Sequence, residues 1–454
     1  MKIRVKPVLT YGVYQRREET SWRPWGGLQT ESDAQEEAQR IGRELEALAL
    51  RASFPMEIEP LSSLKSLSDV SGIEEALTSA DVTLIYAAGG GQDILEALVA
   101  SSRWSIIFLR HRSGPLYLWY EIIHPSFLRK RSDEFAQPMV GVDDVVVDDY
   151  EEVLWRLRAL YGLKNTLGSR IVAIGSPSGW AIGDKAVALA QQRWHLDIQT
   201  VTYPDLAERI RKAQADGAIV KEAHQQAEEY LSQPGVSMHT ERSFVDNAFV
   251  LHRVFRDLMA ERDAPAITVN ECMTTIIPMA QTTACLPLSV INDTGDLAFC
   301  ESDFVVIPSG ILLHHISGKP VFLNDPTYPH DGVVTLAHCT APRRMSGEND
   351  EPAEIVTHFE SDYGAAPKVE FRRGQQVTLI IPDFGEQSWV VSRGKILDTP
   401  FLPVCRSQAD VEIEGDWRKL LREMKGFHWM MGYDDYLREV EYALGKVGLG
   451  VVTI

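Results

Sequence analysis

The sequence predicts a mixed α/β protein in which two open α/β domains are followed by a β-rich, barrel-like domain. Strand and helix patterns alternate through the first third of the chain, and the alternation starts again near residue 166. Such alternation is typical of a parallel sheet covered by helices. After Arg344 the pattern changes to short β runs separated by Gly, Asp and Pro. With 454 residues the chain is also too long for one ordinary core, because single cores stop growing at roughly 250–300 residues.

The first α/β region contains three strand patterns and one long helix pattern. Residues 2–9, 82–88 and 104–109 are apolar enough to form buried strands. Residues 31–51 carry apolar side chains three and four positions apart, which predicts an amphipathic helix. Strands in this order, with helices between them, predict a parallel sheet.

The second α/β region repeats this pattern without any sequence repeat. We expect buried strands at 170–174 and 266–269 and a long amphipathic helix at 245–262. The glycine-rich turns at 89–91 and 175–179 match neither the dinucleotide-binding motif nor the P-loop motif. We therefore interpret both as tight turns, for which glycine is well suited.

The last part of the chain is predicted to form an antiparallel sheet or a small barrel. Its short β runs are punctuated by turn residues and lie at 369–371, 376–381, 389–392 and 395–397. Helix patterns follow at 417–425 and 434–444.

The composition argues against several classes of protein. The net charge of −19 disfavours a nucleic-acid partner, because attraction to phosphates needs clustered Lys and Arg, and it weakly favours a neutral ligand. No stretch approaches the ~18 uninterrupted apolar residues of a membrane helix, and the N-terminal residues read as a strand and not as a signal peptide. Five cysteines without C-x-x-C spacing favour reduced thiols in a cytoplasm.

Acidic and histidine side chains follow apolar strand patterns in the region 268–345. Glu271 and Glu301 each end a β run, 266–269 and 297–300, Asp325 caps the predicted strand 320–323, and His338 follows the predicted strand 333–337. In open parallel sheets, ligands bind at the carboxyl ends of the strands. We therefore expect these side chains to converge on one site.

Each of these residues also has an ordinary structural explanation. An acid after a strand is often a helix N-cap, and this interpretation has equal weight for Asp303. A histidine after a strand is often a hydrogen-bonded core group. Several carboxylates within one apolar stretch nevertheless favour a functional site, because their burial is costly unless a cation or donors compensate them. A divalent metal is the simplest explanation.

Carboxylate oxygens with one imidazole suit Mn²⁺ or Mg²⁺. Zn²⁺ and Co²⁺ are less favoured, since a thiolate-rich zinc site needs cysteines at ligand spacing. Cys300 and Cys339 do adjoin Glu301 and His338. On strands, however, neighbouring side chains point to opposite faces, so we expect these thiols to point away from the site.

His428 is the last unusual feature of the sequence. It lies among aromatic and Met side chains in the segment 426–433, for which core packing is the ordinary interpretation. Because Asp434 and Asp435 follow at a predicted helix start, His428 could instead complete a site assembled between domains.

The sequence resembles the L-fucose isomerase and L-arabinose isomerase superfamily, and most closely its fucose isomerase-like members. The segment 300–328, CESDFVVIPSGILLHHISGKPVFLNDPTY, resembles the family segment that holds a metal-binding glutamate and, about two dozen residues later, a metal-binding aspartate. The segment 426–436, GFHWMMGYDDY, resembles the late family segment with the third ligand. Residues 21–48 and 114–127 resemble first-domain segments of the fucose isomerase-like members.

The resemblance implies a fold, a metal and a reaction. Glu301, Asp325 and His428 would bind Mn²⁺ in an enzyme that interconverts aldoses and ketoses through a cis-enediolate. Two Rossmann-like domains would precede the β-rich domain, with domains at 1–165, 166–318 and 319–454. The chain would form a homo-oligomer, a trimer or a hexamer, with active sites near subunit boundaries. The segment between Asp325 and His428 is shorter than in L-fucose isomerase, so the resemblance does not name the sugar.

The same reading gives each candidate residue a role. Glu301 and Asp325 would act as base and acid on the two neighbouring carbons. His338 would hold a substrate hydroxyl or orient a ligand, Glu271 would support the ligands from outside the coordination sphere, and Trp429 would contact the sugar.

A tryptophan–arginine cluster in the first domain is a further candidate sugar contact. Trp22 and Arg23, with Trp25, could grip a sugar ring, although packing at an oligomer contact explains them equally well. The alternatives to an isomerase are a metal-dependent lyase or epimerase acting on a polyol or sugar acid, and a sugar-binding relative without catalysis.

Overall fold

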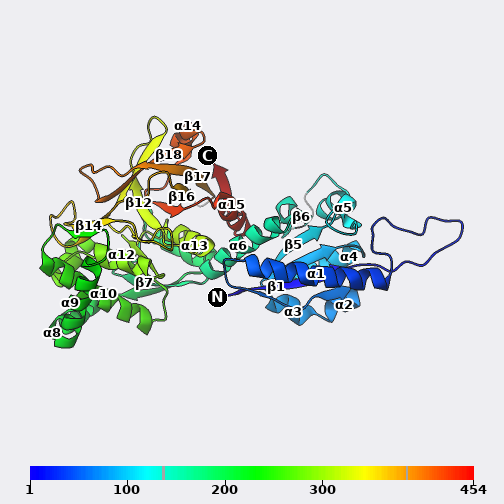
Figure 1. Cartoon of the computed structure of the whole chain (residues 1–454), viewed down its shortest axis with the longest axis horizontal. Helices are drawn as coiled ribbons and strands as arrows, with labels where there is room; N and C mark the ends of the chain where they lie inside the picture. The colour runs from blue at the N-terminus through cyan, green and yellow to red at the C-terminus, as the bar shows by residue number, and fades with distance from the viewer. Residues whose placement is uncertain (135–136, 138, 385–386) are drawn as a thin grey trace. The chain divides into compact units, whose positions relative to one another are not determined.

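The computed structural model describes residues 1–134, 137, 139–384 and 387–454. The chain forms two compact units, the N-terminal unit Met1–Lys164 and the C-terminal unit Asn165–Ile454 (Figure 1). It is a mixed α/β protein with two parallel sheets and a closed barrel of six strands. The predicted fold class is confirmed at this level. The further division at 318/319 and the Rossmann-like character of the two sheets stay predictions.

The N-terminal unit is built on a parallel sheet with the strand order β2-β1-β4-β5-β6, in which β3 also pairs with β1. The strands are β1 (Ile3–Thr10), β2 (Met56–Ile58), β3 (Ser62–Leu64), β4 (Val82–Ala87), β5 (Trp104–Leu109) and β6 (Val145–Val147). Every residue of β4 and β5 is buried, as expected for parallel strands covered on both faces.

The helices of the N-terminal unit follow the predicted alternation. They are α1 (Glu31–Arg51), α2 (Leu67–Ser71), α3 (Glu74–Ser79), α4 (Gln92–Ser101), α5 (Trp119–Ile122) and α6 (Tyr150–Thr166). Helix α1 has the predicted bounds because Thr30 caps it. The Thr30 hydroxyl accepts from the Asp33 amide, and the Asp33 carboxylate accepts from the Thr30 amide, which is a capping box.

The C-terminal unit begins with a four-stranded parallel sheet in the order β11-β10-β7-β8. Its strands are β7 (Arg170–Ile174), β8 (Asp197–Val201), β10 (Ala266–Val269) and β11 (Leu297–Cys300). Its helices are α7 (Asp184–Arg193), α8 (Tyr203–Ala215), α9 (Gly217–Leu231), α10 (Arg242–Glu261), α11 (Ile277–Ala280) and α12 (Cys285–Asp293). The apolar face of α10 forms much of the core beside this sheet.

The barrel follows in the same unit. Its strand order is β16-β19-β12-β13-β18-β17, and pairing of β17 with β16 closes it. The strands are β12 (Phe322–Pro326), β13 (Val333–His338), β16 (Gln376–Ile381), β17 (Ser388–Asp398), β18 (Ser407–Glu414) and β19 (Trp429–Tyr433). Outside it, β20 (Gly450–Thr453) pairs with β17, and β14 (Ala353–Val356), β15 (Ala366–Val369) and β9 (Val236–Met238) form a small sheet. The helices α13 (Ile307–Ser317), α14 (Trp417–Glu423) and α15 (Leu437–Lys446) complete the unit.

Four predicted strand boundaries in this region are wrong. The predicted run 369–371 overlaps β15 only at Val369. The runs 389–392 and 395–397 form the single strand β17, in which Gly394 sits where a Cβ would lie 2.5 Å from Val411. The predicted strand 320–323 begins later, at Phe322, so Asp325 lies inside β12 and does not cap it. His338 is the last residue of β13 and does not follow it. Local sequence does not show these limits because cross-strand partners set them.

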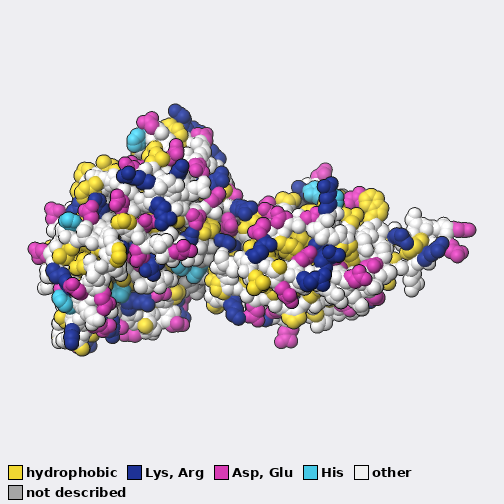
Figure 2. Space-filling view, viewed as in Figure 1, with side chains coloured by type: hydrophobic (Ala, Val, Ile, Leu, Met, Phe, Trp, Pro, Cys, Tyr) yellow, Lys and Arg dark blue, Asp and Glu magenta, His cyan; other side chains and the backbone are white. Residues whose placement is uncertain are grey.

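Among the described helices, no single one is long and apolar enough to cross a membrane; the bent pair Cys272–Ala280 and Cys285–Asp293 reaches that length and composition only in combination. Figure 2 shows acidic and basic side chains interspersed over the described surface in view, without a continuous basic area there. The absence of a nucleic-acid partner stays a prediction.

Candidate metal centre

The antiparallel register of the barrel brings three predicted site residues to one end of it. Strand β12 lies between β13 and β19. Asp325 pairs with Ala337 of β13, and Asn324 pairs with Trp429 of β19. Continuing the second register by one residue places Asp325 beside His428. Since His338 directly follows Ala337, Asp325, His338 and His428 lie together.

Glu301 reaches this point from the parallel sheet. Strand β11 ends at Cys300, and the next two residues, Glu301 and Ser302, have φ values of 62° and 46°. Left-handed backbone is uncommon for residues with side chains and clusters at functional sites. The turn continues to Asp303, which bridges to Ser178 in the loop after β7. The chain thus turns sharply at Glu301.

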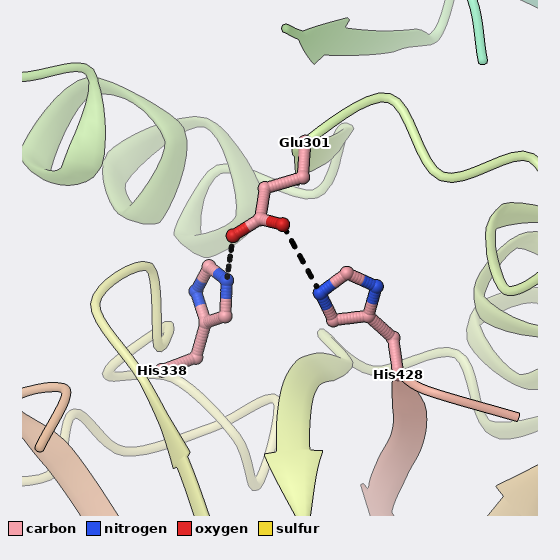
Figure 3. A group of neighbouring side chains, drawn as sticks. All are labelled: Glu301, His338 and His428. Carbon is pink, nitrogen blue, oxygen red and sulfur yellow. Dashed lines mark ion pairs between the residues drawn. The ribbon is translucent and has the colours of Figure 1, made fainter. Parts of the chain in front are cut away.

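The carboxylate of Glu301 lies between the imidazoles of His338 and His428 (Figure 3). Its Oε2 is 3.4 Å from His428 Nε2, and its Oε1 is 3.9 Å from His338 Nε2. One ligand atom from each residue lies within 4.8 Å of the others. Asp325 adds a second carboxylate, with its Oδ1 3.2 Å from His428 Nε2. Glu301, His338 and His428 therefore form a group that could hold a metal ion.

Two buried atoms at this centre support a cation. Among the described residues, Asp325 Oδ1 and His428 Nε2 have no hydrogen-bond partner, although nearly all buried polar atoms in proteins do. They lie 3.2 Å apart without forming a hydrogen bond to each other. Ligand atoms bound at about 2.1 Å are about 3.0 Å apart in an octahedron and about 3.4 Å apart in a tetrahedron. A divalent cation between them would satisfy both atoms.

Asp303 fixes the orientation of His428. Its Oδ2 lies 2.8 Å from His428 Nδ1, and its Oδ1 accepts from the amides of Val305 at 3.0 Å and Trp180 at 3.3 Å. Both His428 and Asp303 are almost fully buried. A carboxylate on Nδ1 favours the tautomer with the proton there, which leaves the Nε2 lone pair for a cation.

The charges at the centre depend on one another. Burial opposes ionisation of Glu301, but His338 and His428 hold the pKa of its carboxyl well below the usual range. Burial also lowers the pKa of His428, yet Asp303, Asp325 and Glu301 together raise it to about 11. The pKa of His338 is raised in the same way, chiefly by Glu301 acting against burial. Without a metal, protons on the histidines balance the carboxylates, and a cation would take their place.

A cavity of about 530 Å³ adjoins the centre, within the usual range for small-molecule sites. Glu301 and His338 line it, together with the loops that follow β7, β10 and β11. The indole of Trp180 stacks on Phe427 with ring centroids 4.0 Å apart, and its Nε1 donates to Glu301 Oε2 at 3.1 Å. The carboxyl ends of three parallel strands therefore open onto this cavity, as expected for a ligand site.

The other predicted site residues lie elsewhere. Glu271 lines the cavity, where it accepts from Thr275 Oγ1 at 3.2 Å, but it is not in the ligand group. Trp429 is fully buried in the barrel core and supports the strand that follows His428. Trp22 and Arg23 belong to the N-terminal unit, where the guanidinium lies 4.9 Å from the ring centre. Their part in sugar binding stays a prediction.

Two expectations about this region are corrected. Only Glu271 and Glu301 follow parallel strands, whereas Asp325 and His338 belong to antiparallel barrel strands. Cys300 and Cys339 were expected to point away from the site, but both line the cavity. Alternation of side chains fails there because Glu301 and Cys339 lie just beyond their strands, in turns that alter the direction of the chain.

Sequence patterns missed the functional placement of three residues. For Asp303, a helix cap and a functional role have equal weight in the sequence; it does accept an amide two residues on, and its second oxygen holds His428. Trp180 follows a glycine-rich turn, and an aromatic residue in such a loop was the one available signal. His358 lines the cavity from a loop without any distinguishing pattern.

A comparison with protein-family models and curated proteins finds no match to this chain.

Proposed function

We propose that this chain is a metal-dependent aldose–ketose isomerase that acts on a neutral monosaccharide. The observation that carries the proposal is the grouping of Glu301, Asp325 and His428, the three residues that the family resemblance singled out. Both carboxylates lie within 3.4 Å of His428 Nε2, although the three residues come from distant parts of the chain. Two of the ligand atoms are buried without a hydrogen bond among the described residues.

The donor set indicates which cation would bind. Two carboxylates and one or two imidazoles favour Mn²⁺, with Mg²⁺ as an alternative and Zn²⁺ or Co²⁺ less favoured. Glu301, Asp325 and His428 would hold it, and His338, which belongs to the same group of ligand atoms, would be available as a further ligand. When bound, the cation would stabilise negative charge on the two oxygens of the reacting carbons.

The chain's own residues would move the proton between those carbons. Aldose–ketose isomerisation removes a proton beside a carbonyl and returns it to the neighbouring carbon. Glu301 is suited to act on the substrate because its side chain is 41% exposed and lines the cavity. Asp325, 31% exposed, is the second carboxylate within reach. Trp180 and His338 would hold Glu301 in place through contacts to its two oxygens.

The cavity wall favours a neutral sugar. Its described lining contains the carboxylates Glu271, Glu301 and Glu360 but neither Lys nor Arg. An anionic sugar in this cavity would face these carboxylates without a Lys or Arg side chain to compensate its charge. Its binding would therefore be costly. The overall charge of −19 adds to the repulsion.

As parts of the same proposal, the two parallel-sheet regions are Rossmann-like, and the protein forms a cytoplasmic homo-oligomer.

The test is incubation of the Mn²⁺-loaded protein with neutral aldoses and ketoses in D₂O. The proposal predicts interconversion of one aldose–ketose pair with deuterium at C1 or C2. Glu301→Gln and Asp325→Asn should abolish it, whereas Glu412→Gln, which changes an exposed barrel carboxylate, should not. Carbon–carbon cleavage products would favour a lyase, and inversion at one carbon would favour an epimerase. Activity that resists chelators would contradict the proposal.

A further inference from the structure

Three thiols from distant parts of the sequence meet in the wall of the cavity. Cys285 and Cys339 are buried together around Ala366, and Cys405 packs against them. All three line the cavity beside the metal centre, and none is in a disulfide. We define these residues as the thiol cluster.

Secondary structure explains why these thiols meet. His338 of β13 pairs with Ser407 of β18, so continuing this antiparallel register by one residue places Cys339 beside Arg406 and next to Cys405. Cys285 is the first residue of α12 and packs in the same buried cluster as Cys339. Cys339 is thus the shared neighbour of the other two thiols.

The arrangement of the cluster does not favour a shared metal ion. Among the described residues, the three sulfurs form no group in which all ligand atoms lie close enough to hold one ion. A ligand that needs only two neighbouring sulfurs therefore fits the cluster better.

Neighbouring thiols suit a ligand that accepts two sulfurs and releases their hydrogens as water. A trivalent arsenic oxide does so. Its As=O oxygen leaves as water with the two thiol hydrogens, two As–S bonds form, and arsenic stays trivalent. Soft centres of this kind prefer sulfur ligands. The reaction needs no oxidant and only two thiols in contact.

We propose that Cys339 and Cys405 form a binding site for trivalent arsenicals, opening onto the cavity beside the metal centre. Cys405 is the partner because it is the least buried thiol of the cluster and offers the route of entry. Cys339 directly follows His338, which contacts Glu301.

The experiment uses phenylarsine oxide with the purified full-length chain under reducing conditions. Intact-mass measurement should show one phenylarsenic group bound with loss of two hydrogen atoms. Titration should show loss of two of the five free thiols. An excess of a small dithiol, but not of a monothiol, should reverse both changes.

Matched variants identify the two thiols. Cys339→Ser and Cys405→Ser should each weaken binding at least tenfold, whereas Cys272→Ser, which changes another thiol in the cavity wall, should not. Cys339→Ala and Cys405→Ala repeat the test if a serine variant fails to fold. Binding unchanged without Cys339, or lost only in Cys285→Ser, would overturn the proposal. Thiol count and mass do not depend on activity or metal, so these outcomes are independent of the isomerase proposal.

Discussion

Asp303 Oδ2 lies 2.8 Å from Nδ1 of His428, and both side chains are almost completely buried. The pair connects the turn after the parallel sheet with the segment that enters the last barrel strand. It leaves Nε2 of His428 directed at Glu301 and Asp325. We therefore predict that metal binding at the candidate centre depends on Asp303, a residue that does not itself line the cavity.

Asp303→Asn tests this dependence. The side-chain oxygen of the substituted residue can still accept hydrogen bonds from the backbone amides of Val305 and Trp180. Its NH₂ group, however, can donate to Nδ1 of His428 and so favour a proton on Nε2, where the cation should bind. We expect Mn²⁺ affinity to fall by about 10–100-fold with little change in the thermal midpoint. Calorimetric titration with Mn²⁺ checks this, with Glu412→Gln as the control. Affinity equal to that of the wild type would show that Asp303 does not set the tautomer.

Mn²⁺ uptake should release protons. In the metal-free protein three carboxylates raise the pKa of His428 to about 11, so the imidazole is charged at neutral pH and must lose its proton to bind a cation. Below that pKa, apparent affinity should therefore rise by about tenfold per pH unit. Titration in two buffers of different ionisation enthalpy measures the protons released. Binding that is independent of pH between about pH 6 and pH 9 would rule out this exchange.

Trp180→Phe should weaken catalysis more than folding. The substitution removes the donor to Glu301 Oε2 but keeps an aromatic ring against Phe427. A hydrogen bond to a charged group contributes about 1.5 kcal/mol or more, and the partial exposure of Trp180 reduces this. We therefore expect kcat to fall about tenfold with a nearly unchanged KM. Trp180→Ala, which also removes the stacking on Phe427, should lower kcat further. Equal kcat values for wild type and Trp180→Phe would exclude this positioning role.

His252 should make the protein sensitive to mild acid. Burial, with a contribution from Arg256, lowers the pKa of His252 to about 4, and its Nε2 has no hydrogen-bond partner among the described residues. A histidine whose folded pKa lies below its unfolded value of about 6.5 costs stability as the pH falls from 6.5 towards 4, by up to about 3 kcal/mol. His252→Phe should remove this part of the pH dependence. Urea unfolding at pH 7.5 and pH 5 measures it, and equal pH dependence in both proteins would contradict the assignment.

The parts of the fold that were predictable from the sequence are those that local signals determine. Helix α1 has the predicted bounds because Thr30 and Asp33 cap it, and β7, β10 and β11 coincide with continuous apolar runs between turns. The barrel strands were less predictable. The limits of β12 and β17 depend on partners many residues away, and no periodicity encodes the closing pairing of β17 with β16.

The candidate site was predictable in part for the same reason. Glu271 and Glu301 stand out because acids follow apolar strands, and the family resemblance supplied His428. The contact of His428 with Asp325 follows from barrel register, and the role of Asp303 follows from a buried contact across 125 positions. Neither the contact of His428 with Asp325 nor the role of Asp303 produces a recognisable pattern in the neighbouring sequence. The thiol cluster was missed because alternation along a strand was assumed to continue into the turn after His338.

Mn²⁺ bound per chain, measured by elemental analysis after equilibrium dialysis, tests the central claim most directly. The proposed metal centre of Glu301, Asp325 and His428 predicts one Mn²⁺ per wild-type chain. Glu301→Gln and Asp325→Asn should each bind at least about 100-fold more weakly while keeping the wild-type circular dichroism spectrum, and Glu412→Gln should bind as the wild type does. A wild-type chain without stoichiometric Mn²⁺ or Mg²⁺, or variants that retain wild-type affinity, would contradict the account.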